Sequence, residues 1–150
     1  MILHTTSEVI SLAKNLESES ARIYEELSEI YEQDKNIFLA YSSENSKNIK
    51  QIERVYYGTI SDAIEGTFAF NLESDNYSFR EVTKEASEYP VALEKAVTVE
   101  KLIIKFYFDA AAQSESLLAD VQRIFTLMAR KRAERIEKLG VLLDSTKADI

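Results

Sequence analysis

The chain has 150 residues, a net charge of −8 and no cysteine, and 45% of its residues are hydrophobic. That length and balance predict one globular domain over residues 1–150, while the lack of cysteine excludes disulfides, thiol catalysis and cysteine-ligated metal sites. Phosphate binding needs a cationic surface, so the acidic balance also argues against general nucleic-acid binding and favours a solvated helix face for the basic run at 130–132.

Two long helices are predicted in the first part of the chain. Thr5 and Glu8 have the spacing of a capping box, and apolar residues then recur every three or four positions, which predicts a helix over about 7–32. A second apolar stripe follows Asp34, a residue type that caps helices, and predicts a helix over about 35–57. The few residues between the two helices predict an antiparallel hairpin.

A second pair of helices is predicted near the end of the chain. Pro90 suits the first turn of a helix, and the stripe that follows predicts a helix over about 91–113. A serine can cap the fourth stripe, which predicts a helix over about 116–139 because Gly140 follows it. These two helices should form a second antiparallel hairpin.

Residues 58–90 connect the two predicted hairpins. The segment is long enough to cross the length of a helical bundle, and its runs at 61–64 and 78–82 indicate short helices. It also carries four aromatic residues, Phe68, Phe70, Tyr77 and Phe79. These side chains either support a homodimer, which we expect, or plug one end of the bundle. The predicted fold class is all-α, a four-helix bundle of two hairpins with one long crossover.

The chain also repeats itself. Glu17 and Tyr24 match Glu100 and Tyr107 at an offset of 83 residues, and the second helix matches the fourth at an offset of 87. Both glutamates lie inside an apolar stripe at helical neighbour spacing, so both should face inward. An isolated buried carboxylate costs several kcal/mol unless a cation, a metal or a proton compensates it. Something must therefore neutralise these two charges.

This pattern resembles the rubrerythrin branch of the ferritin-like superfamily over nearly the whole chain. The resemblance implies a di-iron or di-manganese centre with one glutamate on each of the first and third helices and a Glu-x-x-His pair on each of the other two. Glu17 and Glu100 match the single glutamates, and Tyr24 and Tyr107 would contact the ligands.

The paired positions depart from the family pattern. Glu44 matches a paired glutamate, but Lys47 replaces its histidine, and on the last helix Lys131 and Glu134 replace the glutamate and the histidine. An ammonium group has no lone pair to offer a metal and repels a divalent ion. A normal two-metal centre is therefore not expected.

Charge counting leaves two outcomes for this centre. Its four glutamates give −4 and its two lysines add +2, so the remaining −2 favours either one bound divalent ion or two shared protons. We favour the metal-free outcome, because iron sites made only of oxygen ligands are uncommon. Lys47, Lys131 and Glu134 could instead point to solvent, since a slip of one residue rotates a helix face by about 100°.

Two functions follow from the resemblance. The first is a ferritin-like protein without a cofactor, in which a buried Glu–Lys network replaces the metal centre and the role is structural or partner-binding rather than catalytic. The alternative is an iron- or manganese-binding oxidoreductase or peroxide scavenger. That alternative would use four glutamates as metal ligands, Glu17, Glu44, Glu100 and Glu134.

The remaining features concern partners and location. A metal-active form would need an external electron-transfer partner, because the four-cysteine module of rubrerythrins is lacking. The only histidine, His4, is expected at the surface rather than as a ligand. No apolar stretch approaches the length of a membrane helix and no leader pattern opens the chain, so we expect a cytoplasmic protein.

Overall fold

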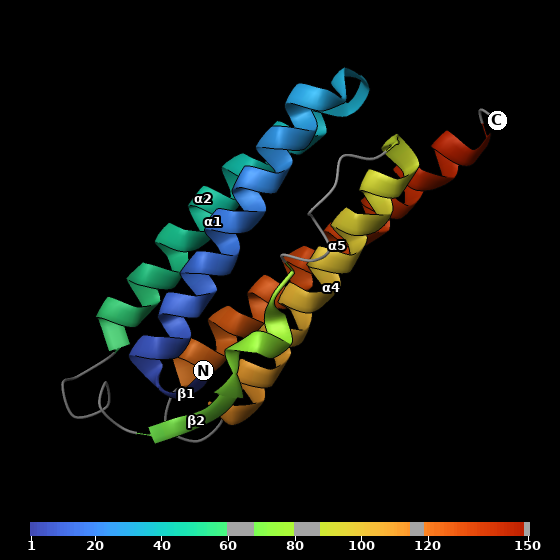
Figure 1. The fold of residues 1–150 in the computed structure, drawn as a ribbon. Helices are drawn as coiled ribbons and strands as arrows, with labels where there is room; N and C mark the ends of the chain where they lie inside the picture. Colours follow the sequence, from blue (N-terminus) through green and yellow to red (C-terminus); the bar gives the residue numbers. More distant parts are fainter. Residues whose placement is uncertain (60–67, 80–87, 115–118, 149–150) are drawn as a thin grey trace.

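The computed structural model describes residues 1–59, 68–79, 88–114 and 119–148, and these residues are mostly helical (Figure 1). They form four long helices, α1 (Thr6–Ile30), α2 (Lys35–Thr59), α4 (Tyr89–Gln113) and α5 (Ala119–Ala148). They also form two short 3-10 helices, η1 (Glu32–Asp34) and η2 (Ser74–Tyr77), and two strands, β1 (Ile2–Thr5) and β2 (Phe68–Glu73). The predicted all-α character is confirmed, with a small sheet in addition.

The beginnings of α1 and α4 follow from local sequence. At α1, the Glu8 N–H donates to Thr5 Oγ1 at 3.2 Å and the Thr5 N–H donates to Glu8 Oε1 at 3.1 Å, which is the predicted capping box. At α4, Pro90 lies in the first turn, where its missing N–H costs nothing. Both helices begin within two residues of the predicted positions.

The end of α5 differs from the prediction. The helix runs on through Gly140 to Ala148, so the predicted end at 139 is wrong. Gly140 keeps a negative φ, and Leu142 and Leu143 continue the apolar stripe by packing against buried residues. A glycine that does not adopt the left-handed conformation leaves the helix free to continue.

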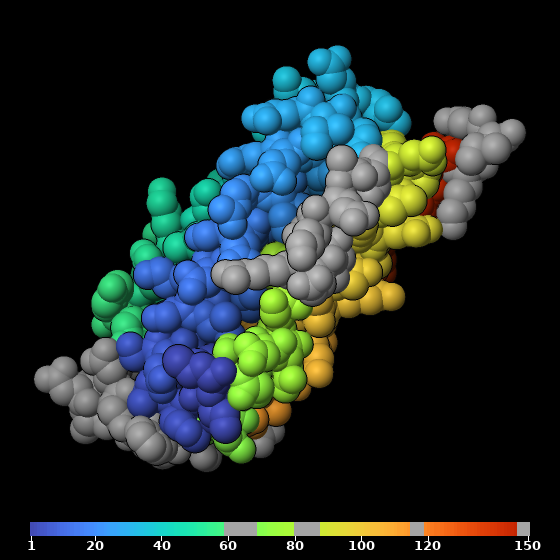
Figure 2. Space-filling model, in the orientation of Figure 1, coloured from blue at the N-terminus to red at the C-terminus, as the bar shows by residue number. Residues whose placement is uncertain are grey.

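The crossover segment contains a strand, β2, that was not predicted, and Ser78 and Phe79 at the start of the predicted short helix at 78–82 are not helical. β2 pairs antiparallel with β1, with Leu3 opposite Leu72, and the two strands lie side by side at one end of the molecule (Figures 1 and 2). The predicted short helix at 61–64 and residues 80–82 lie outside the described residues. Phe70, Tyr77 and Phe79 are buried, which favours the plug over an exposed dimer contact; the Phe68 side chain is not described.

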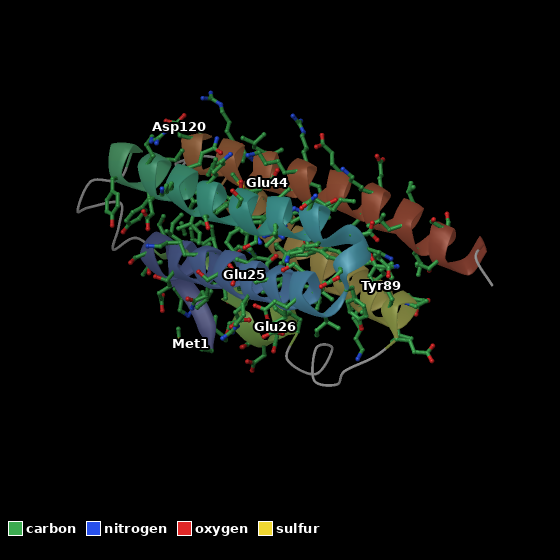
Figure 3. The ribbon with its side chains drawn as sticks, turned by 90° about the horizontal axis from the view of Figure 1, so that it is seen from above. Met1, Glu25, Glu26, Glu44, Tyr89 and Asp120 are labelled. Carbon is green, nitrogen blue, oxygen red and sulfur yellow. The ribbon has the colours of Figure 1, made fainter. Side chains whose placement is uncertain are left out.

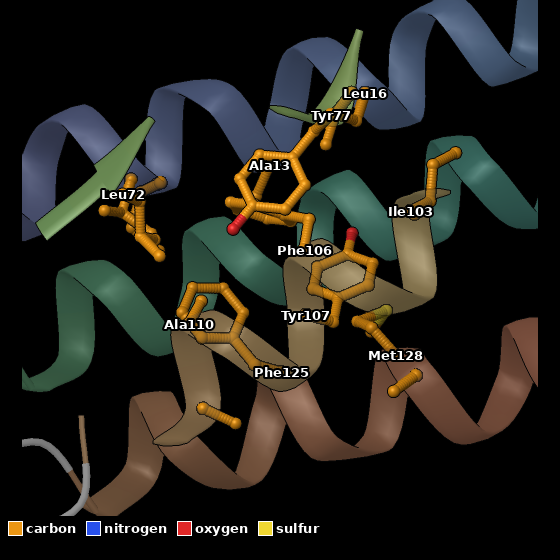
Figure 4. Packing of buried hydrophobic residues seen from close by; sticks show 14 of the residues in the cluster. Ala13, Leu16, Leu72, Tyr77, Ile103, Phe106, Tyr107, Ala110, Phe125 and Met128 are labelled. Atoms are coloured by element: carbon orange, nitrogen blue, oxygen red, sulfur yellow. The ribbon is translucent and has the colours of Figure 1, made fainter. Parts of the chain in front are cut away.

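The four helices pack as two antiparallel pairs, α1 with α2 and α4 with α5 (Figure 1). The described residues form two hydrophobic clusters between the pairs. The cluster beside the sheet includes the rings of Phe106, Tyr107 and Phe125 (Figure 4). The other surrounds Tyr24 and Leu93 nearer the α1–α2 connection. In the described parts of the chain, no helix has the length and apolar character needed to cross a membrane.

Candidate functional site

A buried arginine joins the two inward-facing glutamates. Arg132 Nη2 lies 2.7 Å from Glu17 Oε2, and its Nη1 lies 2.8 Å from Glu100 Oε1, with all three side chains fully buried. Nη1 also donates to Ser20 Oγ at 2.9 Å. Burial alone would lower the pKa of the Arg132 guanidinium, but the two carboxylates raise that pKa well above its ordinary value. The guanidinium therefore stays charged and holds α5 to both α1 and α4.

Two tyrosines donate hydrogen bonds to the buried carboxylates, each to the glutamate on the other helix. The Tyr24 hydroxyl on α1 donates to Glu100 Oε1 at 2.6 Å, and the Tyr107 hydroxyl on α4 donates to Glu17 Oε1 at 2.6 Å. Burial and then the neighbouring carboxylate raise the pKa of each tyrosine well above its ordinary value. Both hydroxyls are therefore protonated donors, and each glutamate accepts a hydrogen bond from the helix that carries the other.

A second arginine carries the ion cluster toward the surface. Arg135 Nη2 donates to Glu44 Oε1 at 2.9 Å, and its Nη1 lies 3.4 Å from Glu100 Oε1. Its guanidinium also lies over the rings of Tyr24 and Tyr41, at 5.4 and 4.8 Å from their centroids. Arg135 is 2% exposed whereas the Glu44 side chain is 40% exposed, so Glu44 marks the rim of the cluster between α2 and α5 (Figure 3).

Amide side chains on α2 line the same centre. Asn45 Nδ2 donates to Ser20 Oγ at 3.1 Å, and Asn48 Nδ2 donates to Glu17 Oε2 at 3.4 Å, with both asparagines fully buried. Lys131 is partly buried at the edge, where its Nζ donates to Asn48 Oδ1 at 3.2 Å. Neutral amides thus occupy the α2 side of the centre and guanidiniums occupy the α5 side.

The structure corrects the basic partners that the sequence suggested. Lys47 and Glu134 are exposed, and Lys131 Nζ donates to the amide oxygens of Asn48 and Gln51. Among the described residues, none of these three pairs with a buried carboxylate. The compensating cations are Arg132 and Arg135. The buried network is therefore a Glu–Arg network rather than the predicted Glu–Lys network.

A rotation of one residue on both helices explains the correction. The inward pair on α2 is Asn45 and Asn48, and the inward pair on α5 is Arg132 and Arg135, which follow them by the same 87 residues. The predicted residues, Glu44 and Lys47 on α2 and Lys131 and Glu134 on α5, each lie one position earlier in the sequence. The repeat alone could not reveal this, because both pairings satisfy the offset of 87 and differ by about 100° of helix rotation. The available signal was the pair of asparagines, which are polar residues inside an apolar stripe.

The chemistry of these residues does not fit the di-iron or di-manganese centre that the family resemblance implies. Glu17 and Glu100 contribute −2, and Arg132 and Arg135 contribute +2, so the fully buried charges cancel without an ion. The partly buried Glu44 and Lys131 add −1 and +1, so they leave this sum unchanged. A guanidinium has no lone pair for a metal, and it occupies the carboxylate oxygens that would be ligands. Within the described residues, no group of three or more acidic, histidine or cysteine side chains is arranged to hold a metal ion.

Comparison of the chain with protein-family models, curated proteins and solved structures finds no match. The resemblance to ferritin-like proteins therefore remains a prediction based on the residues themselves.

Proposed function

We propose that the protein is a ferritin-like four-helix protein, related to rubrerythrins, in which a buried Glu–Arg network takes the place of the dinuclear metal centre. One observation carries the proposal: the Arg132 guanidinium lies between Glu17 and Glu100, at 2.7 and 2.8 Å from their oxygens. These are the two carboxylates that match the single glutamates of the family's metal site. The proposed role is structural or partner-binding, without redox catalysis.

The placement of the arginines supports the same proposal. Arg132 and Arg135 stand three residues apart on α5, the spacing of the family's Glu-x-x-His pair, and Asn45 and Asn48 stand likewise on α2. All four side chains are buried, and the two asparagines donate hydrogen bonds to Ser20 and Glu17 on α1. On this proposal, each inward position that the family pattern implies for a dinuclear site has a counterpart in this chain, but four of the six side chains are of the wrong chemical type to bind iron.

Iron binding by the purified protein tests this proposal. Wild-type protein incubated with ferrous ion under nitrogen and then passed through a desalting column should retain no stoichiometric iron by elemental analysis. Retention of one or two irons per chain would overturn the proposal and favour the metalloprotein alternative. This measurement needs no variant, so it does not depend on whether a substituted chain folds.

A gain-of-function variant sharpens the test. The changes Asn45→Glu, Asn48→His, Arg132→Glu and Arg135→His rebuild a Glu-x-x-His pair on α2 and on α5, and the folded variant should bind about two ferrous ions per chain. The matched control makes the corresponding changes one residue earlier. It carries Lys47→His, Lys131→Glu and Glu134→His, whose side chains lie at the surface or the edge, and it should bind none tightly.

A further inference from the structure

A basic ridge on the outer surface of α5 stands out on this acidic protein. We define the ridge by Arg123, Leu127 and Arg130, which are all exposed and succeed one another at helical spacing of four and three residues. Arg123 is paired only with Asp120, at 2.9 Å in the same helix, and no ion pair engages Arg130 within the described residues. On a chain of net charge −8, this face therefore places an arginine on either side of an exposed leucine.

Hollows of ligand size flank the ridge. One, of about 310 Å³, lies between the end of α2 and the beginning of α5, and Arg54, Val55 and Ile124 line it together with ridge residues. The other, of about 290 Å³, also borders Arg123 and Leu127 and extends to Arg130. Figure 3 shows Asp120 at the start of α5, beside the end of α2, which places the first hollow in the molecule. Both hollows share Arg123 and Leu127, so the ridge borders the two of them.

This surface combines three guanidiniums with apolar side chains and one carboxylate, Asp120, which is paired with Arg123. Arg54 adds a third guanidinium, and no ion pair engages it in the described part of the chain. Leu127 is 37% exposed between the arginines, and Val55 and Ile124 supply further apolar contact. Arginine binds carboxylates through paired N–H donors, and exposed apolar groups at the centre of such a patch are typical of protein-binding surfaces.

We propose that this ridge binds a short partner segment in which acidic and apolar side chains alternate. The inference rests on the proposed function, because it identifies the kind of partner that a non-catalytic protein of this type would bind. The acidic side chains of the partner would pair with the arginines of the ridge. Its apolar side chains would contact Leu127 and the hollows beside it. A nucleic acid would use the arginines but leave the apolar contacts without a partner, and the strongly acidic remainder of the chain would repel it.

Fluorescence anisotropy with a short fluorescein-labelled peptide of alternating glutamate and leucine tests the proposal. The wild-type protein should bind it with an affinity that falls as sodium chloride is raised, and a peptide with lysine in place of glutamate should not bind. The double change Arg123→Glu and Arg130→Glu should weaken binding roughly tenfold or more, and Leu127→Ser should weaken it by a smaller factor. Equal binding of the peptide by wild type and by the double variant would overturn the proposal, as would no binding by wild type.

A matched control separates local from global charge. Arg22→Glu with Lys101→Glu makes the same change in net charge at exposed positions on α1 and α4, and it should leave the affinity unchanged. Circular dichroism of every variant confirms that the helices are intact. A single-stranded oligonucleotide that competes the peptide from the ridge with higher affinity would also contradict the proposal. Iron content measured on the same wild-type sample reports on the ion network independently, so failure of the ridge and failure of the proposed function remain distinguishable.

Discussion

The two helical hairpins present the same frame with different chemistry. In each, the first helix buries a glutamate and, seven residues later, a tyrosine, Glu17 and Tyr24 on α1 or Glu100 and Tyr107 on α4. The second helix of the α1–α2 hairpin buries two asparagines at the repeat positions where the α4–α5 hairpin buries two arginines. The fully buried charge is therefore −1 in the first hairpin and +1 in the second.

Because of this difference in buried charge, each hairpin depends on the other for stability. Neither hairpin is neutral inside, and each carboxylate takes its closest contacts from the other half or from α5, as Tyr107 and Arg132 do for Glu17. A buried ion pair gives little net stability over apolar packing, but removal of one partner leaves a charge that the interior cannot solvate. The cost of a substitution should therefore depend on which hairpin it alters.

The largest difference is expected between the repeat-related positions 132 and 45. Arg132→Met leaves two buried carboxylates with their main cation gone and should reduce the free energy of unfolding by about 3–5 kcal/mol. Asn45→Met removes only a neutral hydrogen bond to Ser20 and should cost about 1–2 kcal/mol. Urea denaturation followed by circular dichroism measures both, and equal losses would contradict the asymmetry.

If Arg132→Met does not fold, a charge-removing variant keeps the comparison testable. Glu17→Gln and Glu100→Gln, combined with Arg132→Met, remove both buried carboxylates together with their shared cation, and Arg135 then keeps Glu44 as its counter-ion. This triple variant should regain most of the stability that Arg132→Met loses, because a neutral amide costs much less to bury than a carboxylate. A triple variant less stable than the single one would show that the charges are not the cause.

The two tyrosines should also differ, although less. Tyr107→Phe leaves Glu17 with Arg132 Nη2 and a long contact of 3.4 Å to Asn48, so it should cost about 1.5–3 kcal/mol. Tyr24→Phe leaves Glu100 with two oxygens still held by Arg132, so a loss of about 1 kcal/mol is expected. Thermal unfolding of the two variants side by side measures the difference, and a larger loss for Tyr24→Phe would reverse the inferred order.

Alkaline pH should weaken both hairpins alike. Burial raises the pKa of Tyr24 and Tyr107 well above the ordinary value of about 10, so the folded protein keeps protons that the unfolded chain loses. Their contribution is fully present below about pH 10 and is lost as the pH rises toward the folded pKa values, by up to about 1.4 kcal/mol per pH unit for each tyrosine. Each Tyr→Phe change should reduce the slope of unfolding free energy against pH by one such step, and an unchanged slope would refute the assignment.

The smallest effect is expected at the rim of the network. Glu44 pairs with Arg135 but is 40% exposed, and Arg135 keeps Glu100 and the Tyr41 carbonyl when Glu44 is neutralised. Glu44→Gln should therefore cost about 0–1 kcal/mol, and less at high salt. Denaturation at low and high sodium chloride checks this, with Glu100→Gln as the buried comparison. If Glu44→Gln lowers the free energy of unfolding as much as Glu100→Gln does, Glu44 is not a solvent-screened residue at the rim.

The helices and the acidic half of the site could be predicted because apolar spacing reports directly on which face is buried. The α1 capping box, the start of α4 at Tyr89 and the burial of Glu17 and Glu100 all follow from local patterns. The sheet could not be predicted, because β1 has only four residues and its partner lies more than 60 positions away.

The basic half of the site could not be predicted for a different reason. On α5, Lys131 and Arg132 are neighbouring cations, and the one that reaches the carboxylates is decided by helix rotation, which depends on contacts with α1 and α4 rather than on the residues of α5 alone. On α2, Glu44 is next to the neutral Asn45. Because a carboxylate is a usual metal ligand and an amide is not, the sequence favours Glu44 as the inward residue. Charge marks candidates for a site, but packing selects among them.

The polar layer also lies between two hydrophobic clusters, which has a consequence for how the hairpins can be assembled. On α4, Ala96 belongs to one cluster and Ile103 to the other, with Glu100 between them. A slide of one hairpin along the other by a single helical turn, about 5.4 Å, would bring the guanidiniums against apolar side chains and leave the carboxylates facing hydrocarbon. An interior made only of apolar side chains tolerates such slides. Here the observed alignment is the one that brings Glu17 and Glu100 against Arg132 and Arg135.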